Sequence, residues 1–180
     1  DKLYQNLLSA VIINGRARET RGTRSLELHQ VMIALVNPLA NKVSNPVRKL
    51  NTAYRAAEFL WIHTGLDSAA WIGRYNSQVL KYADQNDGQS FFGAYGPRWR
   101  NNRDRIVGVL KKDLGSRQAV VTFWRNDLPD YTADVPCTVG LMFLINDGKL
   151  DLTVTMRSND AWLGFPYDIY VYDAPELGGS

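Results

Sequence analysis

The 180-residue sequence predicts a single α+β domain, with helices packed on a mixed, bulged β-sheet. An Asp147-Gly148 pair between two apolar runs predicts a tight β-hairpin, because both turn positions need positive φ. Apolar residues at helical spacing predict helices over residues 3–13, 51–64 and 101–114. A hydrophobic content of 45% is sufficient for one sizeable core.

The N-terminal third alternates helical and extended patterns. The first helix should end at Asn14-Gly15. A basic loop should follow it, and residues 25–36 read as a strand in which a change of parity near Gln30 is consistent with a bulge. Asn51 or Thr52 should begin the next helix, and Asp67 should cap the one after it.

The central region contains a stretch rich in glycine and aromatic residues, 93–100, which reads as a packed turn. The helix over residues 101–114 should close at Gly115. A strand over residues 119–124 follows, and a loop over 126–134 then leads to the only cysteine.

That cysteine, Cys137, lies just before the first strand of the predicted hairpin. A two-residue turn sets Asn146 opposite Lys149, and Cys137 opposite Ser158. Strict alternation would put Cys137 and Arg157 on opposite faces, so a bulge or a frayed end is needed to bring them together. An arginine nearby favours the nucleophilic thiolate. The alternative is a buried structural cysteine.

Composition narrows the class of protein. A net charge of +3 and a pI near 9.0 suit an anionic substrate such as a phosphate, but not a nucleic-acid-binding tail. One cysteine excludes an internal disulfide and points to a reducing, cytoplasmic location. No apolar run approaches the roughly 18 residues of a membrane span. No metal-ligand spacing is present, and His29 and His63 read as structural.

Three ordered blocks carry a family resemblance. Pro136-Cys137, the hairpin, and Arg157-Ser158-x-Asp160-x-x-Leu163-Gly164-x-Pro166-Tyr167 together resemble the thymidylate synthase and pyrimidine nucleotide hydroxymethylase family. Upstream, Glu58-x-x-Trp61-x-x-x-Gly65 and Tyr95-Gly96 also match. The nearest branch contains the cytidylate and deoxycytidylate hydroxymethylases. The resemblance implies one-carbon transfer from 5,10-methylenetetrahydrofolate to carbon 5 of a pyrimidine nucleoside monophosphate by a homodimer that associates through its sheet.

The resemblance also implies roles for single residues. Cys137 would add to carbon 6 of the base, Glu58 would manage protons, and Tyr95 would line the site. On its own, Glu58 reads as the edge of a buried helical stripe. The nucleotide-binding set would be Arg21 (or Arg18, because the alignment slips), Arg117, Arg157, Ser158, Asp160 and Asp168. Arg117 would reach the partner's phosphate, although Gln118 replaces the family's second arginine.

Asp168 bears on the choice of base. Thymidylate synthases have asparagine in the corresponding place, which pairs with uracil. A carboxylate suits the exocyclic amine of cytosine and repels the oxygen of uracil. Such a mismatch can discriminate by about 10⁴-fold in an enclosed site. Asp168 therefore favours a cytidine-type substrate; the alternative is a helix-capping or surface aspartate.

The sequence departs from the family pattern at several positions, so we keep alternative functions. Thr138 replaces the family's histidine, and Met156 replaces its glutamine. The resemblance covers residues 3–173, about two-thirds of a family member, and residues 174–180 read as a linker, so we expect a chain truncated at its C-terminus. The alternatives are a thymidylate synthase acting on deoxyuridylate, a non-catalytic nucleotide-binding or dimerisation module, and, least favoured, a nucleic-acid binder.

Overall fold

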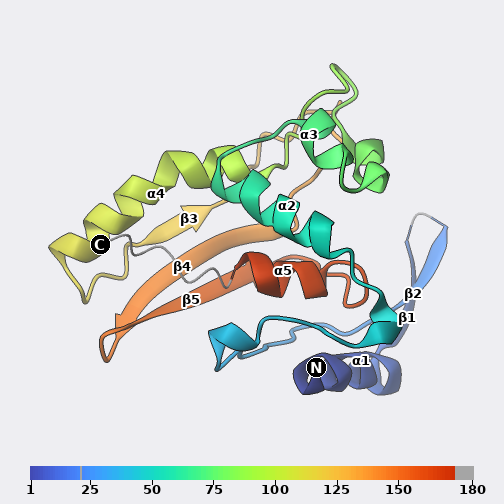
Figure 1. Ribbon diagram of the computed structural model, residues 1–180, viewed down its shortest axis with the longest axis horizontal. Helices are drawn as coiled ribbons and strands as arrows, with labels where there is room; N and C mark the ends of the chain where they lie inside the picture. Colours follow the sequence, from blue (N-terminus) through green and yellow to red (C-terminus); the bar gives the residue numbers. More distant parts are fainter. Residues whose placement is uncertain (21, 173–180) are drawn as a thin grey trace. The chain divides into compact units, whose positions relative to one another are not determined.

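The computed structural model describes residues 1–20 and 22–172 (Figure 1). Its elements, in chain order, are α1 (Lys2–Asn14), β1 (Arg16–Thr20), β2 (Thr23–Glu27), η1 (Pro38–Ala40), η2 (Pro46–Arg48), α2 (Thr52–His63), α3 (Ala69–Gly73), η3 (Ser77–Tyr82), α4 (Tyr95–Lys112), β3 (Val120–Thr122), β4 (Thr138–Asn146), β5 (Lys149–Met156) and α5 (Phe165–Val171).

The chain forms two compact units. The first unit is Asp1–Asn51 together with the chain from Asp160, and the second unit is Thr52–Asn159. Helices and strands both contribute, as the predicted α+β class requires. The prediction of one domain over residues 1–180 stays a prediction.

Both sheets in the described part of the chain are antiparallel, where the sequence led us to expect a mixed sheet. β1 pairs with β2 in the first unit, and the order in the second unit is β3-β4-β5. The predicted bulge is present in the second sheet, where the β4–β5 register shifts between Thr138 and Gly140.

The first unit has a small core around Tyr4, Val43 and Phe165, and the rings of Tyr4 and Phe165 are nearly parallel at 6.3 Å. Helix α1 ends at Asn14 with Gly15 after it, as predicted. The Asp1 carboxylate accepts a 2.8 Å hydrogen bond from the Ser44 backbone N–H, which ties the start of the chain to the loop before η2.

Two expectations for the first unit are wrong. The basic loop after α1 is a β-hairpin, in which Arg18 lies opposite Ser25. The strand expected over residues 25–36 ends at Glu27, because the next stretch pairs with no strand among the described residues and Gln30 adopts a φ of 56°. The tail over residues 174–180, which we read as a linker, lies outside the described residues.

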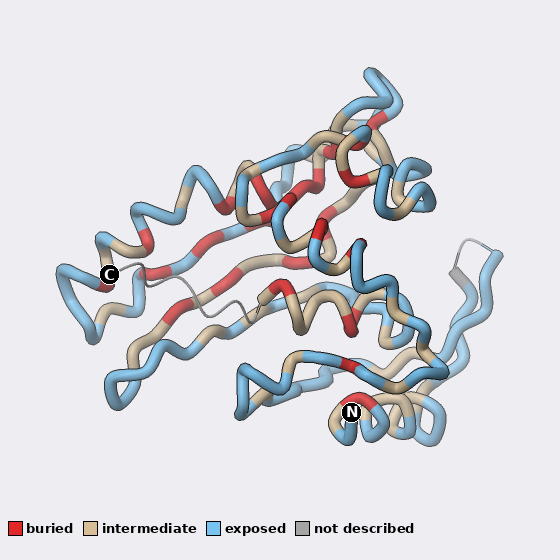
Figure 2. Tube along the Cα trace, viewed as in Figure 1, coloured by how far each residue is buried: buried red, intermediate tan, exposed pale blue. Residues whose placement is uncertain are grey.

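The second unit is a three-stranded sheet with helices beside it. α4 packs along β3 and β4, and α2 packs against α4 (Figure 1). Buried residues recur along β4, among them Leu141 and Phe143 (Figure 2). Trp99 of α4 lies 5.9 Å from Phe143, ring to ring, so the helix and the sheet share one apolar core.

The elements of the second unit differ from expectation at their ends. α4 begins at Tyr95 rather than at residue 101, because the stretch that read as a packed turn forms its first turns. α3 is capped by Ser68, whose hydroxyl oxygen accepts from the Trp71 N–H, rather than by Asp67. β3 covers only Val120–Thr122 of the strand expected over 119–124. No helix in the described ranges is long and apolar enough to cross a lipid bilayer.

Candidate active site

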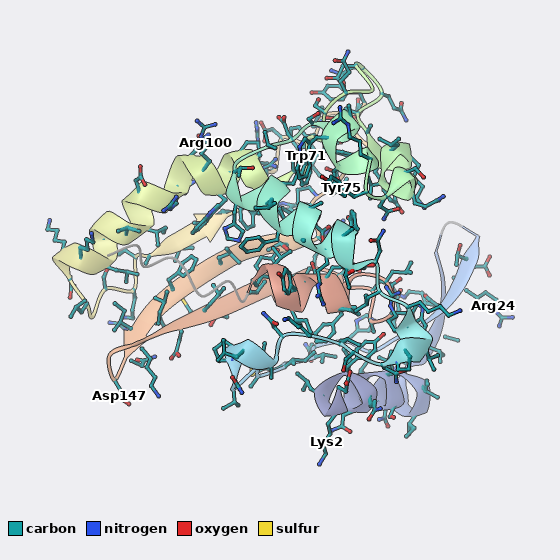
Figure 3. All side chains as sticks on the ribbon, in the orientation of Figure 1. Lys2, Arg24, Trp71, Tyr75, Arg100 and Asp147 are labelled. Carbon is teal, nitrogen blue, oxygen red and sulfur yellow. The ribbon has the colours of Figure 1, made fainter. Side chains whose placement is uncertain are left out.

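The β4–β5 hairpin sets the register of the site. Asp147 and Gly148 both have positive φ, 50° and 71°, and Asn146 lies opposite Lys149, as the sequence predicts. The side chain of Asp147 lies at the tip of the hairpin (Figure 3). At the other end, the bulge moves Thr138 opposite Met156 instead of Arg157. Thr138 is thereby buried.

The bulge brings the cysteine and the arginine together. The Arg157 backbone N–H donates to the Cys137 carbonyl at 2.9 Å, so the two residues are paired directly. The side chains converge as well, with Arg157 Nη2 lying 3.9 Å from Cys137 Sγ. Cys137 is partly buried and forms no disulfide, and a guanidinium this close favours a thiolate. The bulge therefore brings Cys137 and Arg157 together, as the sequence analysis expected.

Arg157 is itself held in place. Its Nε donates to the Pro136 carbonyl at 2.8 Å, and its Nη2 donates to the Val135 carbonyl at 3.0 Å. Its guanidinium also lies 5.7 Å from the centre of the Trp124 ring. Arg157 thus fixes the two residues that immediately precede the sulfur.

Tyr95 approaches the same segment from α4. Its hydroxyl oxygen accepts a 3.1 Å hydrogen bond from the Thr138 N–H, the residue after the cysteine. The ring stacks on Phe123 at 5.1 Å, which limits its movement. The structure therefore brings Tyr95, Cys137 and Arg157 together.

Glu58 lies on α2 and is partly buried. The Tyr54 hydroxyl, one helical turn earlier, donates to Glu58 Oε1 at 2.7 Å. α2 packs on α4, the helix that begins with Tyr95. Glu58 is thus at the edge of the buried stripe, and its carboxylate is oriented by a phenol.

The remaining residues of the predicted phosphate site in the second unit are exposed. Ser158 follows β5 directly, and Arg117 precedes β3 by three residues. Both are accessible to an anion. Arg21 lies outside the described residues. The alternative, Arg18, is in β1, where its Nε lies 3.3 Å from Glu27 Oε2.

Asp160 and Asp168 belong to the first unit and are described within it. Asp160 Oδ1 accepts from the backbone N–H groups of Trp162 and Leu163, at 2.8 and 2.7 Å, so this carboxylate shapes the turn before α5. Asp168 is partly buried in the first turn of α5, and the N-cap of that helix is Gly164. Asp168 is therefore neither the N-cap nor a fully exposed side chain.

Sequence reasoning missed Asp134, a partly buried carboxylate three residues before the cysteine. Burial raises the pKa of Asp134 to about 6; a hydrogen bond from the Gly93 N–H and the charge of Arg98 oppose the increase, and the charge of Asp84 adds to it. Asp84 is 4% exposed and accepts from the Thr132 hydroxyl at 2.6 Å. Local spacing does not link residues this far apart in the sequence, and neither contact belongs to the matched family blocks, so the contacts of Asp84 and Asp134 could not be predicted.

Aromatic side chains are candidate ligand contacts among the described residues. No cluster of three or more histidine, cysteine or acidic side chains able to hold a metal ion occurs among them. The second unit does carry aromatic surface: the Trp71 and Tyr75 rings lie 5.3 Å apart with their planes tilted by 47° (Figure 3). Leu80 is 44% exposed. Such surfaces are what a planar heterocycle stacks on.

The fold and the cysteine–arginine pair define an α+β protein with a cysteine beside an arginine at the open end of a hairpin. Comparison with known proteins identifies the family. The sequence model of the thymidylate synthase family, described as "Thymidylate synthase", matches residues 2–174. The chain therefore belongs to the thymidylate synthase family.

Two relatives carry the same printed name. A "Deoxyuridylate hydroxymethyltransferase" of Bacillus phage SP01 is 33% identical over 181 residues, which is 91% of this chain and 47% of that protein. A "Deoxyuridylate hydroxymethyltransferase" of Pseudomonas phage M6 is 36% identical over 121 residues, 63% of this chain and 34% of that protein. The matched region thus spans about half the length of the first relative and a third of the second.

Proposed function

We propose that the protein transfers a one-carbon unit, as a hydroxymethyl group, to carbon 5 of a pyrimidine nucleoside monophosphate, and that the base is cytosine. The observation that carries this proposal is the 3.9 Å approach of Arg157 Nη2 to Cys137 Sγ. An arginine-paired thiolate at the end of a hairpin is the nucleophile that the reaction needs.

Carbon 5 of a pyrimidine is a poor nucleophile until a group adds to carbon 6. The Cys137 sulfur would form a bond to carbon 6 and push the electron pair of the 5,6 double bond towards the substituent at carbon 4, which makes carbon 5 nucleophilic. The same sulfur would leave when the double bond re-forms and carbon 5 loses its proton. Glu58, oriented by Tyr54, would move the protons, with Tyr95 assisting.

5,10-Methylenetetrahydrofolate, when bound, would supply the one-carbon unit and depart as tetrahydrofolate, and a water molecule would supply the hydroxyl oxygen of the product. The rings of Trp71 and Tyr75, whose planes are tilted by 47°, and the exposed Leu80 are the apolar side chains that would hold the folate ring system. The nucleotide phosphate would be gripped by exposed Arg117, Arg157 and Ser158 and by Arg21. Asp160 would support the segment that carries Asp168.

The choice of cytosine depends on Asp168. A carboxylate accepts hydrogen bonds and donates none at neutral pH, so it pairs with an exocyclic amine and repels a carbonyl oxygen. Asp168 is partly buried and Gly164 occupies the N-cap position, which supports a role for Asp168 in recognising the base rather than in capping the helix. Deoxyuridylate is the second candidate substrate, because both relatives are named for it.

Release of tritium from carbon 5 tests both candidates in the protein at its natural length. We expect release from cytidylate or deoxycytidylate with methylenetetrahydrofolate present, and a hydroxymethylated product by mass spectrometry. Asp168→Asn should shift the ratio of kcat/KM values for cytosine and uracil nucleotides by at least about 10-fold towards uracil. A wild type that prefers deoxyuridylate would favour the second candidate, and nucleotide binding without release would favour a non-catalytic module.

A further inference from the structure

The segment before the cysteine, residues 131–136, is tied to an earlier loop by a chain of hydrogen bonds; we call this segment the strap. The Thr132 hydroxyl donates to the buried Asp84 Oδ1 at 2.6 Å, and the Asp134 N–H donates to Thr132 Oγ1 at 3.1 Å. The Gln85 N–H donates to the Tyr131 carbonyl at 3.2 Å. The strap is therefore docked on the loop that begins at Asp84.

The strap also contacts Gly93, through Asp134; we call this contact the junction. The Gly93 N–H donates to the Asp134 carboxylate. A Cβ atom on Gly93 would lie 2.3 Å from the Asp134 carbonyl oxygen and 2.6 Å from its Oδ2. Real Cβ atoms do not approach oxygen so closely, so glycine is needed here for close backbone approach rather than for its φ.

Each of the two segments that meet at Gly93 and Asp134 continues within three residues to a residue of the candidate active site. Two residues after Gly93 comes Tyr95, whose hydroxyl accepts from the Thr138 N–H. Three residues after Asp134 comes Cys137, and Arg157 holds the two carbonyls between them. The cysteine itself precedes β4, which begins at Thr138, so the ladder of the sheet does not fix it alone.

We propose that Asp134 is a positioning residue, whose hydrogen bond to Gly93 clamps the strap so that Cys137 is held against Arg157 and Tyr95. This inference rests on the proposed function for its kinetic consequence, but not for its structural one. The carboxylate acts as an acceptor, so an amide of the same shape replaces it and a methyl group does not. Misplacing a nucleophile by about 1 Å can cost up to 100-fold in rate.

The test compares Asp134→Ala, Asp134→Asn and Gly93→Ala with the exposed carboxylate control Asp130→Ala, which lies just before the strap. We expect kcat to fall about 10- to 100-fold in Asp134→Ala and Gly93→Ala, with nucleotide Kd by calorimetry within about 3-fold of wild type. Asp134→Asn and Asp130→Ala should retain kcat within about 3-fold. This split between kcat and binding separates positioning from general damage.

Alkylation by iodoacetamide gives a readout that needs neither nucleotide nor folate, because Cys137 is the only cysteine. The pH midpoint of alkylation should rise in Asp134→Ala, in the same direction as in Arg157→Met, and should stay at the wild-type value in Asp134→Asn. If wild type releases no tritium, the proposed function fails while the alkylation series still tests the clamp.

Two results would overturn the clamp: an Asp134→Ala protein with the kcat and alkylation midpoint of wild type, or an Asp134→Asn protein that loses as much as Asp134→Ala. Should Asp134→Ala not fold by circular dichroism, Thr132→Val releases the same strap from Asp84 without touching Gly93. It should lower kcat and raise the alkylation midpoint in the same way, and wild-type values there would count against the proposal.

Discussion

The Arg157 guanidinium carries a positive charge and also makes directed contacts, and a substitution by lysine separates these two properties. Its planar guanidinium binds the Pro136 and Val135 carbonyls, lies over Trp124 and reaches the Cys137 sulfur. Lysine keeps the charge but cannot make this set of directed contacts. The position should therefore tolerate lysine poorly and methionine worse.

We expect kcat/KM for tritium release to fall about 10-fold in Arg157→Lys and about 100-fold in Arg157→Met, since each hydrogen bond to a charged donor contributes roughly 1.5 kcal/mol. Steady-state kinetics with saturating folate measures both. Arg103→Met, an exposed arginine of α4, is the matched control. A lysine variant within twofold of wild type would show that charge alone is sufficient.

Asp134 also makes stability depend on pH. Its pKa rises from 3.8 to about 6 on folding, chiefly by burial, with Asp84 adding to the increase and Gly93 and Arg98 opposing it. An acid with a raised pKa binds its proton more tightly when folded. Its contribution to stability is complete below pH 3.8 and is lost as the pH rises through about 6.

Asp134→Asn removes that loss, because asparagine accepts from Gly93 and never ionises. At about 1.36 kcal/mol per pKa unit, the variant should be more stable than wild type at pH 8 by on the order of 3 kcal/mol. The advantage should shrink towards pH 4. Urea unfolding at both pH values measures it, and an equal difference at the two pH values would contradict the assignment.

At the scale of the element, the β4–β5 hairpin owes its register to its turn. Gly148 has a φ of 71°, and a Cβ atom there would meet open space, so alanine is strained by conformation and not by contact. Gly148→Ala should destabilise the protein by roughly 1–2 kcal/mol in urea unfolding. The turn lies at the opposite end of the hairpin from the sulfur, so kcat should stay within twofold.

Gly108 supplies the matched control, because it also has open space but lies within α4. Alanine should stabilise that helix by about 1 kcal/mol. Opposite signs for the two glycine-to-alanine changes are therefore expected. Two changes of the same sign would mean that backbone conformation does not govern the turn.

The hairpin was predictable because its signals are local. Asp147-Gly148 fixes the turn, and the need to bring Cys137 and Arg157 together required the bulge that the structure has at Thr138–Gly140. The strand expected over residues 25–36 failed because strand propensity needs a pairing partner, and Val31 and Met32 are exposed instead. Local pattern could not supply the partner.

The start of α4 shows a second limit. Glycine and proline near Tyr95 read as a turn, yet both are tolerated in the first turn of a helix, and the buried Trp99 anchors it. The Gly93–Asp134 junction was unpredictable for a different reason. It joins two segments 41 positions apart through a close backbone contact, which leaves no periodic trace in the sequence.

At the scale of the whole molecule, the residues proposed for the reaction come from both units. Cys137, the proposed nucleophile, and Arg157 lie in the second unit, and Asp168, proposed to recognise the base, lies in the first. The chain also spans about half of its first relative. Catalytic activity and dimerisation should therefore both be measured in the protein at its natural length.

The proposed trans contact of Arg117 gives a test of that association. If Arg117 of one copy binds the phosphate in the other copy's site, Arg117→Glu and Cys137→Ser proteins should each be nearly inactive alone. Mixing them in equal amounts, with exchange of subunits, leaves about a quarter of the sites with neither change. Tritium release should recover to that level at moderate salt. No recovery, with exchange of subunits confirmed by native mass spectrometry, would place Arg117 in its own subunit's site or in none.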